Sequence, residues 1–264
     1  GECGGLRCPC TCAQEFLCEY WDAVNAALET AEEEYARGMS LKELAPGIFH
    51  VEFSHQLLMA STMVRIQERY ECPADALRGR GFTLAEYKAW ERESQGGFTY
   101  YDTWPGFNVP SSVVKVVFKD EERLLPRERA LRHILAPALT LDKFYLIGTC
   151  VHDGSDSLPH ELSHGMYEMD DAYREVIEKE LAKIKPGMMQ RMRKYLTSHG
   201  YANVDRILLD EVHAYLLDGH HLGCSSSETG PFTARVRDAF LKHAGDLGRR
   251  LLSQCGSASD DFWY

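Results

Sequence analysis

One eight-residue stretch, Leu-Pro-His-Glu-Leu-Ser-His-Gly at 158–165, constrains the fold of this 264-residue chain more than any other. It contains the pattern His-Glu-x-x-His. On a helix, residues four apart lie on one face, so His160 and His164 can offer two imidazole nitrogens to one metal ion. Glu161 is rotated from that direction by about 100° but stays close enough to hold a water on the same ion. One helical turn therefore supplies two candidate ligands and a general base.

The residues on either side of this stretch predict a strand followed by a helix. Residues 143–150 are rich in aromatic and branched side chains, which is typical of a β-strand. Polar oxygens at residues 155–157 can cap a helix, and Pro159 suits a first helical turn. Apolar residues at helical spacing then continue to about Leu181. We expect a strand, a polar connection and the metal-binding helix in that order.

A third ligand must come from elsewhere, because catalytic zinc usually has three protein ligands and a water. Glu168 lies eight residues beyond the first histidine, about 12 Å along the helix axis, which is too far. Asp170 lies six residues after His164, where metzincin-like enzymes place their third ligand. Those enzymes have a glycine between to break the helix, and Tyr167 occupies that place here, so we expect Asp170 to continue the same helix. Glu211 is the better candidate, because it lies 211 − 164 = 47 residues after the second histidine on a separate helix predicted at 204–217.

A glutamate on a second helix that completes His-Glu-x-x-His resembles the gluzincin group of zincin metallopeptidases, to which thermolysin-like enzymes and many aminopeptidases belong. The resemblance covers residues from about 144 to 217 and is one of pattern. It implies one Zn²⁺ per chain, held by His160, His164 and Glu211. It also implies that Glu161 acts as general base in cleaving a peptide or protein substrate. The strand at 144–150 would border the cleft and pair with the extended substrate.

Gluzincins usually also place a histidine or tyrosine near the developing oxyanion. By position, the candidates here are Tyr215, His220 and His221, although Tyr215 equally suits a core position. Asp210 either orients a histidine ligand or lies on the helix surface. His213 lies two residues after the candidate glutamate and faces another direction, which makes it a poor ligand.

Two other functions compete with a zinc peptidase. Glu161 and His164 also form a Glu-x-x-His pair, as in di-iron helical bundles, and Glu52 and His55 form a second one. With Glu211 as a bridge, these residues would make an oxygen-activating di-iron enzyme. A domain with this fold that binds a partner without catalysis is the third interpretation. The intact base at position 161 argues against it.

The remaining pattern predicts an α+β fold that is mostly helical, with a small β-sheet and a zincin-like core. Capping boxes begin short helices at Ser40 and Thr83. We expect strands at 47–53, 113–118 and 143–150, loops at 96–110 and 219–230, and further helices at 13–37, 54–70, 126–135, 188–196, 204–217 and 233–254.

Composition limits the partners and the compartment. A formal charge of −11 argues against nucleic acid, and no apolar run approaches the roughly 20 residues of a membrane span. Five of the nine cysteines lie within the first 18 residues. We expect a cysteine-rich tail at 1–12 and a single domain at 13–264. An odd number of cysteines favours the cytoplasm, and secretion stays open if the tail is disulfide-bonded. The sequence leaves the oligomeric state open.

Overall fold

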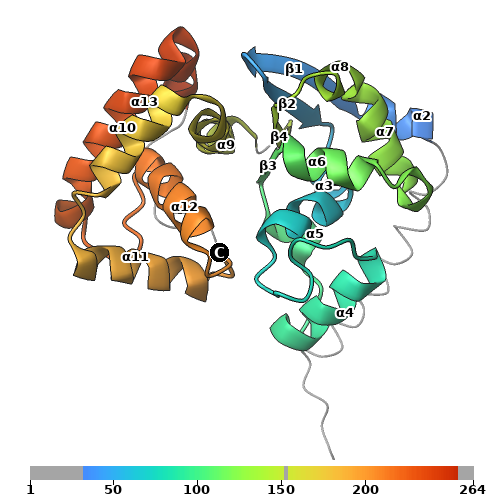
Figure 1. The fold of residues 1–264 in the computed structure, drawn as a ribbon, viewed down its shortest axis with the longest axis horizontal. Coiled ribbons are helices and arrows are strands. Elements are labelled where there is room, and N and C mark those ends of the chain that lie inside the picture. The colour runs from blue at the N-terminus through green and yellow to red at the C-terminus, as the bar shows by residue number, and fades with distance from the viewer. Residues whose placement is uncertain (1–31, 152–153, 255–264) are drawn as a thin grey trace, which may run out of the picture.

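The computed structural model describes residues 32–151 and 154–254 (Figure 1). The predicted tail at 1–12 and residues 13–31 of the helix predicted at 13–37 lie outside these residues. Helix α2 (Glu32–Arg37) covers the last six residues of that prediction. Two of the cysteines in the described part, Cys72 and Cys150, are buried among apolar side chains, as small hydrophobic residues are. No helix within the described ranges has the length and apolar character needed to cross a bilayer.

One mixed sheet of four strands forms the centre of the fold, in the order β1–β2–β4–β3. β1 and β2 form an antiparallel hairpin around Pro46 and Gly47, and the φ of +73° at Gly47 is one that glycine adopts easily. β2 is parallel to β4, and β3 is antiparallel to β4. β4 is therefore an inner strand and β3 an edge strand. The strands are β1 (Met39–Ala45), β2 (Ile48–Phe53), β3 (Gly106–Pro110) and β4 (Tyr145–Cys150).

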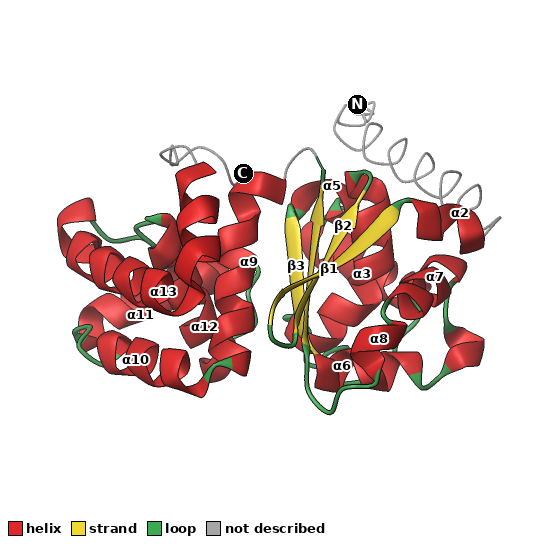
Figure 2. Ribbon diagram, turned by 90° about the horizontal axis from the view of Figure 1, so that it is seen from above, coloured by secondary structure: helices red, strands yellow, loops and turns green. Residues whose placement is uncertain are grey.

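Two groups of helices cover the two faces of the sheet (Figure 2). We call residues 32–151 the sheet half and residues 154–254 the helical half. In the sheet half the helices are α3 (Gln56–Glu71), α4 (Leu84–Gln95), α5 (Tyr100–Thr103), α6 (Ser111–Phe118), α7 (Pro126–Ile134) and α8 (Ala136–Leu139). In the helical half they are α9 (Gly154–Met169), α10 (Asp171–Leu181), α11 (Pro186–Ser198), α12 (Asp205–Asp218) and α13 (Ser226–Gln254).

The alternation of side chains along β4 separates two hydrophobic cores. Leu146 packs into the core around α3, whereas Tyr145 and Ile147 pack into the core around α9. α9 lies close to the sheet because Gly165 faces it. A Cβ atom at that position would lie 3.0 Å from Ile48 Cγ2. The helix that carries the two histidines is therefore anchored directly on the sheet.

Several predictions from the sequence are confirmed. The fold is α+β and mostly helical. The strands expected at 47–53 and 143–150 are β2 and β4. The capping box at the start of α4 is formed, since the backbone N–H of Glu86 donates to Thr83 Oγ1 at 3.2 Å and the N–H of Thr83 donates to Glu86 Oε2 at 2.6 Å.

Two segments adopt the opposite structure to the one predicted. The capping pattern at Ser40 lies in strand β1, because pairing with β2 across the Pro46–Gly47 turn outweighs the local helical signal. Residues 113–118 belong to helix α6 instead of a strand. Its buried residues, Ser111, Val114 and Phe118, have helical spacing, which the run of valines concealed.

The boundaries of α9 also differ from the prediction. The helix begins at Gly154, so residues 155–157 lie inside it instead of before it. It ends at Met169 instead of continuing to Leu181. Asp170 breaks the helix and caps α10 by accepting a hydrogen bond from the N–H of Tyr173 at 3.0 Å. The loops expected at 96–110 and 219–230 are also shorter, since they include α5, β3 and the start of α13.

Candidate metal centre

His160 and His164 project from the same face of α9, as their spacing predicts. Their ring centroids lie 4.9 Å apart at an interplanar angle of 71°. Both residues are buried, and α9 is flanked by the sheet on one side and by α12 on the other. The pair is thus held at the boundary between the sheet half and the helical half.

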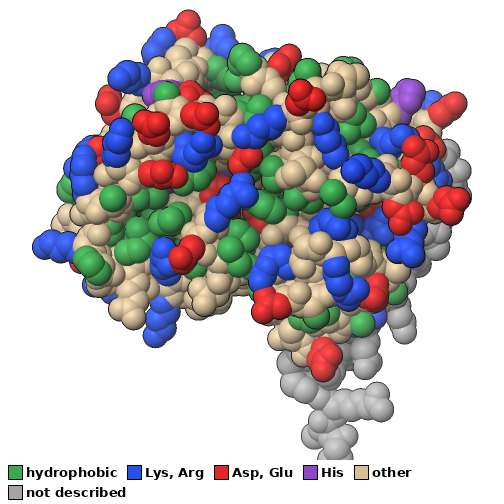
Figure 3. Space-filling model, in the orientation of Figure 1, with side chains coloured by type: hydrophobic (Ala, Val, Ile, Leu, Met, Phe, Trp, Pro, Cys, Tyr) green, Lys and Arg blue, Asp and Glu red, His purple; other side chains and the backbone are tan. Residues whose placement is uncertain are grey.

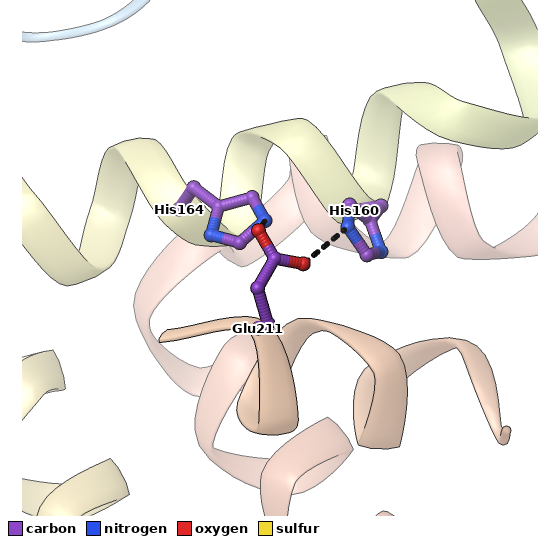
Figure 4. Close-up of side chains that lie close together, drawn as sticks. All are labelled: His160, His164 and Glu211. Atoms are coloured by element: carbon purple, nitrogen blue, oxygen red, sulfur yellow. Dashed lines mark ion pairs between the residues drawn. The ribbon is translucent and has the colours of Figure 1, made fainter. Parts of the chain in front are cut away.

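Glu211 reaches both histidines from α12 (Figure 4). Its Oε2 lies 3.8 Å from Nε2 of His160, and its Oε1 lies 3.7 Å from Nε2 of His164. One possible ligand atom from each of the three residues lies within 4.8 Å of the other two. The chain therefore gathers two imidazole nitrogens and a carboxylate at one buried point, where they could hold a metal ion.

The geometry fits a small divalent cation. Two ligand atoms about 2.0–2.1 Å from a tetrahedral ion are about 3.3 Å apart. The observed separations of 3.7 and 3.8 Å exceed this by a few tenths of an ångström, which a small side-chain movement closes. Nε2 of His164 and Oε2 of Glu211 are buried without a hydrogen-bond partner. Buried polar atoms normally have one, and a shared cation would serve both.

The other ring nitrogen of each histidine faces an aspartate of α12. Nδ1 of His160 is hydrogen-bonded to Oδ2 of Asp218 at 2.6 Å, and Nδ1 of His164 lies 2.8 Å from Oδ1 of Asp210. A carboxylate in this position keeps a proton on Nδ1 and directs the Nε2 lone pair toward the candidate site. α12 therefore supplies the carboxylate of the site and both aspartates behind the histidines.

We expect that replacing Asp218 by asparagine weakens zinc binding by about 10- to 100-fold, the usual cost of losing such a carboxylate. Competition with a chromophoric chelator measures the zinc affinity. Asp205→Asn is the matched control, because it removes a charge from the same helix where Asp205 pairs with Arg193 at the surface. Equal zinc affinities for the two variants would contradict this role of Asp218.

Glu161 points from α9 toward the edge strand β3. Nδ2 of Asn108 donates a hydrogen bond to Oε2 of Glu161 at 2.7 Å, and the hydroxyl of Tyr145 donates to Oδ1 of Asn108, which sets the orientation of the amide. Gly106 provides the space, since a Cβ atom there would overlap the carboxylate. Burial raises the pKa of Glu161, against the opposing charges of the two histidines and the bond from Asn108. A raised pKa suits a general base.

Without a cation, the surrounding carboxylates favour protonated histidines. Burial lowers the pKa of His164, but Asp210 and Glu211 outweigh it and raise that pKa to about 9. Burial likewise opposes the charge on His160, yet Asp218 and Glu211 hold its pKa well above the usual value. Because a metal ion binds neutral imidazole, it must displace these protons.

Zinc affinity is therefore expected to rise with pH from 6.5 to about 9, with release of protons on binding. The stability of the metal-free protein should instead fall as the pH rises over the same interval. A raised histidine pKa contributes stability that is fully present below pH 6.5 and is lost as the pH rises through about 9. Calorimetry in buffers of different ionisation enthalpy measures the number of protons released on zinc binding, and thermal denaturation measures the stability of the metal-free protein. A zinc affinity that is constant over this interval would contradict the prediction.

His213 belongs to a second buried group, with His164 and Asp210, that could also hold a metal ion. Its Nδ1 lies 3.2 Å from Oδ1 of Asp210, and its ring stacks on Tyr167 at a centroid distance of 4.9 Å. As its place in the sequence predicts, His213 does not join the group around Glu211. Asp210 lies between two imidazoles, and both lower its pKa although burial raises it.

Of the predicted oxyanion candidates, Tyr215 borders the site. Its ring packs edge-on against His160, with centroids 5.0 Å apart, and its hydroxyl lies 2.8 Å from that of Tyr201. His220 packs against the ring of Tyr215 at 5.4 Å, and His221 is bonded to a threonine hydroxyl of α13 at 2.9 Å. Tyr215 is thus both a neighbour of the helical core and a neighbour of a candidate ligand.

The residues that sequence spacing disfavoured as ligands lie elsewhere. Glu168 pairs with Lys143 and Arg206, and Asp170 pairs with His243. The Glu-x-x-His pair expected for a di-iron site is not assembled. Glu52 is exposed on β2, and His55 caps α3 by accepting from the N–H of Leu58 at 3.2 Å. Neither residue belongs to a possible metal-binding group of the described chain.

Sequence reasoning missed three residues of the site. Asp218 lies seven residues after Glu211, two helical turns along the same face, so its position could have been recognised. Asn108 and Tyr145 gave no such signal. They meet Glu161 only because β3 and β4 pair with Asn108 opposite Ile147, which places both side chains on the face that α9 covers.

Comparisons with known proteins do not assign the chain to a family. No protein-family model matches the chain, and neither the curated proteins nor the solved structures contain a match. The class of protein is therefore defined by the fold and by the residues of the candidate site. It is an α+β protein with a buried His/His/Glu group that could hold a metal ion.

Proposed function

We propose that this chain is a zinc-dependent peptidase, with His160, His164 and Glu211 as ligands and Glu161 as general base. The observation that carries the proposal is the convergence of three buried ligand atoms, two of them without hydrogen-bond partners, next to a carboxylate that is held in place. A bound Zn²⁺ would supply a Lewis acid that acidifies a water and polarises a carbonyl.

The residues around the ion would then have separate roles in catalysis. Asp218 and Asp210 orient the two imidazoles. Asn108 fixes Oε2 of Glu161. Glu161 takes a proton from the attacking water and passes it to the leaving amine. Tyr215, beside His160, is the nearest of the predicted candidates to a developing oxyanion. The strand that adjoins the base is the edge strand β3. β4, hydrogen-bonded along both edges, cannot pair with a substrate as the resemblance implied.

We also propose that residues 13–264 form one catalytic domain in the cytoplasm. The candidate base rests on β3 in the sheet half, while Glu211 and both aspartates belong to α12 in the helical half. Neither half alone contains the site, which supports a single functional unit.

Metal analysis combined with peptide cleavage tests the proposal. The protein is purified without a nickel column, its metal is measured by elemental mass spectrometry, and pools of peptides are examined for new termini. We expect about one zinc per chain and cleavage that a chelator abolishes. Two irons per chain, or a full complement of zinc without cleavage of any peptide or amide, would contradict the proposed function.

A further inference from the structure

His213 lies in a packed aromatic group next to the candidate metal centre. It is completely buried on α12, three residues after Asp210. Its ring stacks on that of Tyr167 of α9, with centroids 4.9 Å apart and an interplanar angle of 24°. The ring of Tyr173 of α10 meets it at 6.0 Å and 70°. Contacts with two aromatic rings restrict the plane of the imidazole.

One oxygen of Asp210 connects His213 to a candidate ligand. Oδ1 of Asp210 lies 3.2 Å from Nδ1 of His213 and 2.8 Å from Nδ1 of His164. The two imidazole rings are nearly perpendicular, at 84°, with centroids 5.7 Å apart, so they approach the oxygen from different directions. A carboxylate oxygen has two lone pairs and can accept an N–H group from each ring.

These three atoms depend on one another for hydrogen bonding. Oδ1 of Asp210 and Nδ1 of each histidine are buried, and within residues 32–151 and 154–254 none of them is hydrogen-bonded to a group outside this trio. Buried polar atoms in folded proteins are nearly always paired. The contacts with Asp210 are therefore the ones that can satisfy both imidazole N–H groups.

The other candidate histidine ligand is supported differently. Nδ1 of His160 is hydrogen-bonded to Oδ2 of Asp218 at 2.6 Å. Within the described ranges, the ion pair of Asp218 is with His160 alone. Asp218 therefore contacts one imidazole, whereas Asp210 contacts two. The carboxylate behind His164 has an additional support, which is His213.

The orientation of His164 depends on contacts inside the protein. On the face shown in Figure 3, acidic and basic side chains are intermixed over both halves and along the boundary between them. Such a surface does not single out one orientation of a buried imidazole. His164 is itself buried, so its neighbours on α12 determine how its ring is held.

We propose that His213 is a positioning residue for the metal centre. It holds Asp210 against Nδ1 of His164, and Asp210 in turn directs Nε2 of His164 toward the ion. Without His213, the carboxylate keeps only one of its two contacts and can turn away from His164, so that ion binding must also order the ligand. This inference rests on the metal site of the proposed function and does not require that the protein cleaves peptides.

Two substitutions of His213 separate its donor from its packing. His213→Phe keeps an aromatic ring to stack on Tyr167 but has no N–H group. His213→Asn loses the ring but places an amide N–H close to the position of Nδ1. Chelator competition measures the zinc affinity of the full chain, and the absorption spectrum of the cobalt-substituted protein reports the geometry of the ligands. Thermal denaturation of the metal-free protein reports the packing.

A double-mutant cycle tests whether His213 acts through Asp210. His213→Phe is combined with Asp210→Ala and, as the matched control, with Asp218→Asn. In the Asp210→Ala background, His213→Phe should have no further effect on zinc affinity, because the residue through which it acts is absent. In the Asp218→Asn background, the two losses should add, since Asp218 supports the other histidine.

We expect His213→Phe to weaken zinc binding about 10-fold, as for the loss of one hydrogen bond to a charged group, and to alter the cobalt spectrum. His213→Asn should bind zinc more tightly than His213→Phe, although its metal-free form should be the less stable of the two. A residue needed only for packing would give the opposite order of zinc affinities.

Other results would overturn the inference or the function separately. Unchanged zinc affinity in folded His213→Phe would refute the positioning role, as would weaker zinc binding by His213→Asn than by His213→Phe. Two zinc ions per chain, the second lost in His213→Phe, would make this trio a second metal site and also refute it. If Asp210→Ala does not fold, the order of the two His213 variants decides. The expected order in a protein that cleaves no peptide would support the positioning role while the peptidase function fails.

Discussion

Replacing Glu161 by glutamine is expected to lower the rate of peptide hydrolysis by about 10²- to 10⁴-fold, the usual contribution of a general base. Glutamine has the shape of glutamate and keeps an oxygen that can accept the hydrogen bond from Asn108, so the local structure should persist. Because an amide cannot take a proton from water, only the chemical step is lost. Steady-state cleavage and zinc content of the same preparation measure the two effects.

Glu168→Gln is the matched control for this variant. Glu168 lies on the same helix and pairs with Lys143 and Arg206, away from the candidate ligands. We expect it to retain activity. Full activity of Glu161→Gln would refute the role of Glu161 as base. A substrate-binding role that survives in Glu161→Gln without any hydrolysis by the wild type would instead favour a non-catalytic domain.

Replacing Glu211 by alanine is expected to remove most of the bound zinc and, with it, the activity. The variant lacks one of three ligands, so the loss of affinity should exceed the roughly 10- to 100-fold cost of losing a carboxylate behind a histidine. Elemental mass spectrometry and chelator competition measure the effect. His160 and His164 would remain on α9 and could hold an ion only weakly.

Folding must be checked separately, because Glu211 is buried. Glu211→Gln keeps the volume of the side chain and serves as a second variant, with circular dichroism and thermal denaturation compared for both. Zinc that stays bound in both folded variants would show that the third ligand is not Glu211. The second buried group, which contains Asp210 and His213, would then be the alternative site to examine.

Much of the candidate site could be predicted because it depends on local spacing. A separation of four residues brings His160 and His164 together on any helix, and helix geometry excluded Glu168. Glu211 was found because a third ligand had to come from another helix, and α12 indeed brings it to both histidines. The fold class followed from the alternation of helical and strand periodicities, which are also local properties.

The tertiary structure alone decided which distant elements meet. The sequence at Ser40 favours a helix, but pairing with β2 makes this segment a strand. The valines at 113–117 belong to a helix, whose buried residues, Ser111, Val114 and Phe118, are spaced three and four apart. Asn108 and Tyr145 join the site through the pairing of β3 with β4. Local spacing fixes what one helix can present, whereas contacts between strands and helices far apart in the chain depend on the total burial of apolar surface, which no short pattern encodes.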